Sequence, residues 1–388
     1  MGGGQFMRYT KCLMLASGIW PMRYLKNPIL HMLYRFWGIL LQTLHTTGTV
    51  TMWTEFFYLL GMNDMKKLTD NIRTGISCFL VVIKVFIFQS ARFTKVLNHV
   101  IEQERIFSNS EDEEIRKLHL NSAKYVRTFA KLIAGLVYST ALLLIVSTYV
   151  AGMKVRNDPL AEKPAILLVR LPFDQNEYYG TALFLQASFV VLFSILYGMT
   201  QVLYISIMVF AKMRLHILQH QIRNFDYYKR MSLVPVDDIG MMKRLIRDHQ
   251  TVIRFVGDLN EAIRLMLLVE FLFSSLNIAT AVFQLISDQN LNDSLFSLQC
   301  ILLIIGQLLV LVWHADVINV ESVNVASALY EFPWYEKSVE IQKMAHIMTI
   351  RAQRPLRLTI GPFKPLTNQI ISQVINVAYS YITIMTRD

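Results

Sequence analysis

The chain of 388 residues is 54% hydrophobic and only 17% charged, and its formal net charge is +10. Together with a mean hydropathy of +0.38, this composition excludes an ordinary soluble globular protein and predicts a polytopic membrane protein. The sequence contains no P-loop, no Rossmann glycine fingerprint and no nucleophile elbow. We therefore expect no enzyme activity, no cofactor and no nucleic-acid partner.

Seven apolar stretches, taken in chain order, predict seven transmembrane helices. Each stretch is bounded by turn residues or charges, and a helix needs about 20 such residues to cross the hydrocarbon core of a bilayer. The stretches are 31–60, 74–90, 132–151, 180–211, 265–287, 294–313 and 365–385. The expected fold is all-α, with a single seven-helix membrane domain over residues 1–388.

The distribution of lysine and arginine predicts how these helices are oriented. Of the 38 basic residues, 28 lie in the first 30 residues and in the segments 91–131, 212–264 and 314–364. Basic segments stay in the cytoplasm under the positive-inside rule, so the N-terminus should be cytoplasmic and the C-terminus extracellular. Asn292 begins the single N-x-Ser/Thr sequon, which falls in a predicted outer loop. This orientation is opposite to that of G-protein-coupled receptors.

The cytoplasmic segments 212–264 and 314–364 are long, and their apolar residues recur near helical spacing. They predict helical extensions that pack beneath the membrane as an anchor, or alternatively basic helices that lie against anionic lipid headgroups. His216 and His220 are four residues apart and share a helical face. No third ligand accompanies them, so we predict no metal site.

An ionisable residue inside a predicted crossing marks a candidate functional site, because a charge is costly there. Lys84 lies in the second crossing, Glu55 in the first and Glu270 in the fifth. Lys84 could pair with either carboxylate, or it could extend its ammonium group to the membrane interface. The sequence leaves these alternatives open.

The last crossing carries a polar stripe. Gln369, Gln373, Asn376, Ser380, Thr383 and Arg387 recur every three or four residues. This spacing places them on one helical face, which at membrane depth must contact water or another polar group. The helix therefore either lines an aqueous pore with other copies or binds neighbouring helices through its polar side chains.

The last part of the chain, from residue 328, resembles one known family. Residues 328–335 read ALYEFPWY, residues 350–366 read IRAQRPLRLTIGPFKPL, and YSYITIM begins at Tyr379. These elements, in this order, resemble the C-terminal signature of insect odorant receptors, and GIWP at residues 18–21 is similar to the opening of that family. The specific match covers about 60 residues, while the remainder is similar only in length and hydrophobic layout.

This resemblance implies an odorant-binding subunit of a ligand-gated, non-selective cation channel in the plasma membrane of olfactory sensory neurons. The chain lacks the long cytoplasmic insertion of the shared co-receptor, so it resembles a tuning subunit. Its expected partners are the co-receptor, in a heterotetramer, a small volatile ligand and membrane lipid. Subunits of the family contact one another through the cytoplasmic anchor.

The resemblance also implies two groups of site residues. Helices one to six, over residues 31–313, would hold the ligand in their outer half, and the last helix, over residues 365–386, would line the pore. The ligand-binding candidates are Phe79, Ile83, Phe86, Tyr138, Leu142, Val146, Tyr149, Phe184, Ser188 and Phe189. The pore candidates are Gln373, Asn376, Ser380, Thr383, Ile384 and Arg387, with Ile384 as the gate. Arg387 departs from the expectation for a cation path.

Two other functions remain compatible with the sequence. Gustatory receptors are also ligand-gated channels, but they typically end in T-Y-x-x-x-L-x-Q-F, and this chain has no Gln-Phe after Tyr381. A transporter would use the polar stripe as a substrate route and should show repeated halves or broken helices. Neither feature is visible in the sequence.

Overall fold

The computed structural model describes residues 6–20, 27–62, 64–155, 163–231, 237–287, 291–367 and 369–385, and these are almost entirely helical. The helices of the N-terminal half are α1 (Arg8–Ala16), α2 (Pro28–Leu60), α3 (Met65–Gln89), α4 (Ala91–Ser108) and α5 (Glu113–Val155). Those of the C-terminal half are α6 (Tyr179–Arg223), α7 (Phe225–Arg230), α8 (Asp238–Ser287), α9 (Leu291–Glu331), α10 (Val339–Ala352) and α11 (Gln369–Met385). A short antiparallel hairpin of β1 (Thr359–Ile360) and β2 (Lys364–Pro365) precedes α11.

The predicted all-α membrane architecture is confirmed. Among the described residues, α3, α5, α6, α8 and α9 are long and apolar enough to cross a bilayer. The first and last predicted crossings fall on α2 and α11, which have 33 and 17 residues. The count of seven crossings and the orientation of the termini stay predictions.

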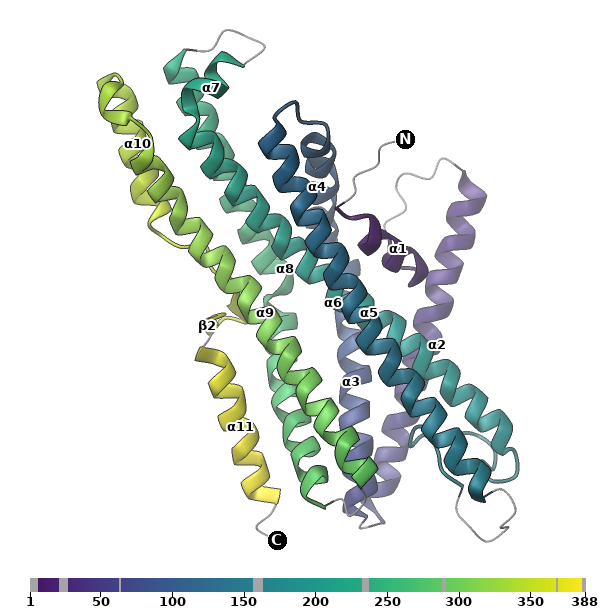
Figure 1. Ribbon diagram of the computed structural model, residues 1–388. Coiled ribbons are helices and arrows are strands. Elements are labelled where there is room, and N and C mark those ends of the chain that lie inside the picture. The colour runs from purple at the N-terminus through teal and green to yellow at the C-terminus, as the bar shows by residue number, and fades with distance from the viewer. Residues whose placement is uncertain are drawn as a thin grey trace.

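Four helices, α5, α6, α8 and α9, continue far beyond their apolar spans. The longest, α8, has 50 residues and α6 has 45, which correspond to about 75 and 68 Å, whereas the hydrocarbon core is about 30 Å thick. The predicted segment 212–264 is therefore formed by the end of α6, the short α7 and the first half of α8. Figure 1 shows α4, α7 and α10 gathered at one end of the molecule, and α11 running toward the other end.

Helix α6 lies at the centre of this arrangement. Residues 198–211 are buried on every face, because α6 contacts α1, α2, α3, α5, α8 and α9. A helix that is hydrophobic all round is stable only when other elements surround it. The other helices are therefore positioned around α6.

Ser90 separates α3 from α4. Its backbone is extended, with φ −60° and ψ 150°, and its hydroxyl accepts a hydrogen bond of 3.2 Å from the amide of Phe93. This is the usual role of serine at a helix N-cap. The rings of Phe88 and Phe93 pack across the bend with centroids 4.5 Å apart. The predicted end of the second crossing at residue 90 coincides with this bend.

The last helix begins at Gln369 rather than at the predicted residue 365. Lys364 and Pro365 pair with β1 in the hairpin, whose turn contains Gly361 with φ +55°, a conformation that favours glycine. The amide of Leu366 also donates to the carbonyl of Leu358 at 2.7 Å. These backbone bonds hold the chain extended until just before α11.

The first described residues are attached to the bundle by a buried carboxylate. Glu104 of α4 is 4% exposed, and its Oε1 accepts hydrogen bonds from the amides of Phe6 at 2.8 Å and Met7 at 3.1 Å. Burial raises the pKa of Glu104, while these two amides lower it in part. Thr10 of α1 also exchanges a hydroxyl hydrogen bond of 2.9 Å with Ser206 of α6. The α1 segment is thus held by side chains far away in sequence.

We expect Glu104→Ala to lower the melting temperature of the detergent-solubilised protein by several degrees. The substitution leaves two buried backbone amides without an acceptor, at a cost of about 1–3 kcal/mol each. The measurement is size-exclusion chromatography with fluorescence detection after heating. Glu102→Ala, on the exposed face of the same helix, is the matched control and should keep the melting temperature of the wild type. Equal melting temperatures of the two variants would contradict a stabilising role for Glu104.

Candidate functional site

A buried ion pair lies within the membrane-spanning part of the bundle. The Nζ of Lys84 on α3 is 2.6 Å from Oε2 of Glu270 on α8, and the two side chains are only 1% and 3% exposed. Of the three alternatives that the sequence left open, which were pairing with Glu55, pairing with Glu270 and extension to the interface, the structure selects pairing with Glu270. Removing one partner of a buried pair leaves an uncompensated charge, which costs about 3–5 kcal/mol.

Side chains from two further helices surround this pair. Gln307 of α9 donates its amide to Glu270 Oε1 and accepts a hydrogen bond from the hydroxyl of Tyr197 on α6. The hydroxyl of Tyr204, also on α6, donates to Gln201. The Lys84 ammonium lies 5.8 Å from the ring centroids of Tyr197 and Tyr204, within the range of a cation–π interaction. We call Lys84, Glu270, Gln307, Tyr197, Gln201 and Tyr204 the four-helix junction.

The sequence analysis missed the α6 and α9 members of this junction. Tyr197, Gln201 and Tyr204 are spaced by four and three residues, so they share a face of α6. A polar side chain on that face, inside an otherwise apolar run, was the signal that could have identified them. Gln307 is one amide in the apolar part of α9, and no spacing distinguishes it.

The structure does not gather the predicted ligand-binding residues around one enclosed cavity. Phe79, Phe86, Tyr138, Leu142, Val146, Tyr149 and Phe184 are between 39% and 71% exposed. Ser188 is also exposed, and Ile83 and Phe189 are half-buried. The rest of the chain covers little of the apolar part of α5. The four candidate residues on this helix, Tyr138, Leu142, Val146 and Tyr149, are therefore exposed. Their role in ligand binding stays a prediction.

Two of these residues do join aromatic clusters between helices. The ring of Phe79 lies 6.3 Å from Trp53 of α2 and 6.3 Å from Phe273 of α8. The ring of Phe189 stacks on the buried His45 of α2 at 5.5 Å. These contacts connect the predicted binding residues of α3 and α6 to α2 and α8.

The polar stripe of α11 faces away from the rest of the chain. Ile370 and Val374, on the opposite face, are buried against the bundle, where α11 packs mainly on α8. The side chains of Gln373, Asn376, Ser380 and Thr383 are exposed. The side chain of Ile384 and the whole of Arg387 lie outside the described residues. The pore role of the stripe stays a prediction.

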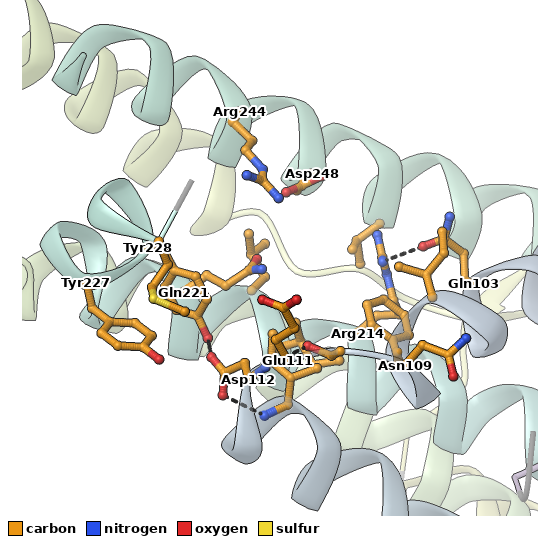
Figure 2. A pocket seen from close by; sticks show the side chains of 18 residues that line it. Gln103, Asn109, Glu111, Asp112, Arg214, Gln221, Tyr227, Tyr228, Arg244 and Asp248 are labelled. Carbon is orange, nitrogen blue, oxygen red and sulfur yellow. Dashed lines mark hydrogen bonds between the residues drawn. The ribbon is translucent and has the colours of Figure 1, made fainter. Parts of the chain in front are cut away.

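Two described cavities lie in the part of the chain that we predict to be cytoplasmic. The first has a volume of about 580 Å³ and lies between the α4–α5 turn, α6, α7 and α8. Figure 2 shows Arg214 bonded to Gln103 on one side, where the distance is 2.9 Å, and Tyr228 bonded to Asp112 on the other. Burial and the hydrogen bond to Asp112 raise the pKa of Tyr228. The second cavity, of about 820 Å³, lies between α4 and α8.

The two histidines that share a helical face contact carboxylates in this region. His216 Nε2 is 3.1 Å from Glu321 Oε1, and His220 Nε2 is 3.8 Å from Asp112 Oδ2. The described residues contain no cluster of three or more metal-ligating side chains. These histidines join α6 to α9 and to the α4–α5 turn.

Comparison with known proteins identifies the family. Residues 64–379 match the family model described as 7tm Odorant receptor. The chain belongs to the insect odorant receptor family. The receptor is 31% identical to Odorant receptor 10 of Aedes albopictus over 184 residues, which are 47% of this chain and 49% of the relative. It is 28% identical to Odorant receptor Or2 of Anopheles gambiae over 146 residues, 38% and 39% of the two chains. The matched region spans half or less of these relatives.

Solved structures show the same fold. The receptor is similar to the insect olfactory receptor OR5 from Machilis hrabei, with a TM-score of 0.76, 14% sequence identity and coverage of 99% of this chain and 98% of the other. A second structure of that protein, in complex with eugenol, matches with the same TM-score over 98% of each chain. The receptor is therefore a multi-pass helical membrane protein of a receptor family rather than an enzyme.

Proposed function

We propose that the receptor is the odorant-binding, tuning subunit of a ligand-gated, non-selective cation channel. The observation that carries this proposal is the exposed polar face of α11, opposite an apolar face that packs on α8. In a single chain, amides and hydroxyls on that face would contact lipid, which offers no hydrogen bonds. If several subunits surrounded a common axis, these groups would line a water-filled pore.

The proposed channel assembles with the co-receptor as a heterotetramer in the plasma membrane of olfactory sensory neurons. The N-terminus is cytoplasmic, and segments 212–264 and 314–364 form the anchor through which subunits contact one another. Thr383 and Ile384 narrow the outer end of the pore, with Ile384 as the gate. The positive charge of Arg387, which lies outside the described residues, would oppose cation flow in a homotetramer, and mixing with co-receptor subunits would dilute it.

The proposed ligand is a small, volatile, mostly apolar molecule that binds among helices α3, α5 and α6. The olfactory receptor from Machilis hrabei, whose fold the receptor shares, was solved with eugenol. A ligand of about 10 heavy atoms at about 0.6–0.8 kcal/mol per atom gains about 6–8 kcal/mol. That gain corresponds to a dissociation constant from tens of micromolar to about 1 micromolar.

The test is whole-cell current during a panel of volatile odorants, with the receptor expressed alone and together with an insect co-receptor. We expect odorant-evoked cation current in the pair and none from the receptor alone. Surface labelling of the receptor is the control for expression. Absence of current from the pair, at verified surface density and across the panel, would contradict the proposal. Uptake of a labelled substrate without current would indicate a transporter.

A further inference from the structure

We propose that the Lys84–Glu270 ion pair is the positioning pair that couples the odorant-binding helices to the pore helix α11. The inference rests on the proposed function and adds the residues that transmit the signal. Both side chains are almost completely buried, and Nζ of Lys84 lies 2.6 Å from Oε2 of Glu270. In this arrangement neither charge is available to a ligand or to a permeating ion, so the pair acts on its surroundings through the helices that carry it.

On one side, Glu270 belongs to the helix that holds the base of α11. Three residues of α8, each four apart, hold the hairpin before α11. Asn260 Oδ1 accepts the amide of Thr359 at 2.7 Å, and the carbonyl of Arg264 accepts the amide of Gly361 at 2.8 Å. Leu268 packs so closely on Gly361 that an added Cβ would lie 3.1 Å from it. A displacement of α8 would therefore move the start of α11.

The first turns of α11 also pack on α8. Ile370 and Val374 are buried where α11 packs on α8. Figure 1 shows the hairpin partway along the molecule, with α11 running from it toward the end opposite α7. Glu270 follows Leu268 by two residues, so the ion pair is formed within one helical turn of the hairpin attachment.

On the other side, Lys84 belongs to α3, which carries three of the predicted ligand-binding residues. Ile83 directly precedes Lys84, and Phe79 packs against Phe273 of α8 at 6.3 Å. The rings of Tyr197 and Tyr204 place α6 beside the same ammonium group. A ligand that shifts α3 relative to α6 would change the position of the Lys84 charge.

A buried ion pair suits a coupling role because its energy depends strongly on the positions of both charges. Inside a low-dielectric bundle, a displaced charge is expensive, so the pair favours discrete arrangements rather than a continuous range. Gln307 bonds both Glu270 and Tyr197 and thus joins the α8 side of the pair to α6. Coupling between distant sites needs such an element whose equilibrium both sites can bias.

The test compares variants of the pair in the receptor expressed with the co-receptor. The informative variants are the apolar double substitution Lys84→Met with Glu270→Met, which removes both charges together, and the charge swap Lys84→Glu with Glu270→Lys. Replacing both partners of a buried pair by apolar groups commonly preserves folding. Lys95→Met, at the exposed Lys95–Asp258 pair of 2.9 Å, is the matched control.

We expect the apolar double variant to reach the surface and to lose at least tenfold of the maximal odorant-evoked current per surface receptor. The charge swap should recover at least a third of the current, and Lys95→Met should stay within twofold of the wild type. Wild-type current from the apolar double variant would overturn the proposal. A charge swap as inactive as the apolar double variant, at equal surface density, would also overturn it.

A second measurement separates failure of this inference from failure of the proposed function. Ser380 on the exposed face of α11 is replaced by cysteine, and its labelling by a membrane-impermeant thiol reagent is timed. The parent receptor without this substitution measures the background. Even in a receptor that conducts no current, the apolar double variant should change the labelling rate at least threefold. An unchanged rate would overturn the coupling, whatever the odorant response.

Discussion

Gly38→Val is expected to remove the receptor from the cell surface. Gly18 and Gly38 bring the chain after α1 into direct backbone contact with α2. A Cβ added at Gly38 would lie 2.5 Å from the carbonyl oxygen of Gly18, and one added at Gly18 would lie 2.3 Å from Cα of Gly38. A real Cβ essentially never lies within 3.0 Å of a non-bonded heavy atom, and a backbone atom cannot move aside as the end of a flexible side chain can. We expect the substitution to lower the free energy of unfolding by about 3 kcal/mol, the upper end of the range for overpacking.

Gly18→Ala should have a similar effect for an additional reason. Gly18 has φ +72°, a left-handed conformation that costs an alanine about 1–2 kcal/mol. Gly135→Ala on α5 and Gly306→Ala on α9 are the matched controls, because no atom lies within 4 Å of a Cβ at either position. Surface immunolabelling and the chromatographic peak of solubilised receptor give the measurement. Normal surface density of Gly38→Val would mean that the contact does not exist in the membrane.

Asn376→Lys is expected to reduce odorant-evoked cation current by tenfold or more at normal surface density. The Asn376 side chain is exposed on the polar face of α11, which we propose lines the pore. A lysine charge about 6 Å from a permeating cation raises its energy by about 3 kcal/mol at an effective dielectric constant of about 20. That energy corresponds to about a hundredfold lower occupancy, of which water in the pore would screen a part.

The opposite charge at the same position provides the control. Asn376→Asp should keep the current and should shift the reversal potential toward that of calcium when external calcium is raised. Both variants have one charged side chain at one site, so a defect in folding would affect them alike. Equal currents from the two variants would show that position 376 does not face the ion path.

Hydrophobic patterning predicted where helices lie and that they extend over the segments 212–264 and 314–364, but it did not predict the residue at which each helix ends. The predicted crossing 180–211 falls within α6, and 265–287 falls within α8. The basic residues that bound these stretches set the predicted edge of the membrane. They do not end a helix, because lysine and arginine are good helix formers and the sequence there contains no proline. The helix therefore continues to a break near residue 224 or 237.

Prediction of the candidate site succeeded only where a residue was energetically unusual for its surroundings. Lys84 and Glu270 were identified because a charge within an apolar stretch requires a partner. Helical spacing also grouped Tyr138, Leu142, Val146 and Tyr149 on one face of α5. It could not reveal that the described part of the chain leaves these four side chains 41–62% exposed, since the covering of a helical face is a tertiary property.

The attachment of α1 has a consequence for the synthesis of the receptor. Thr10 bonds to Ser206, a residue 196 positions later, and Phe6 bonds to Glu104, which is 98 positions later. At about 5–20 residues per second, a ribosome takes about 10–40 seconds to travel from the first of these positions to Ser206. During that interval the binding site of the α1 segment is incomplete, because Glu104 is made about halfway through it and Ser206 only at its end. The α1 segment is therefore made well before its partners and stays accessible to chaperones and to the translocation machinery until they follow.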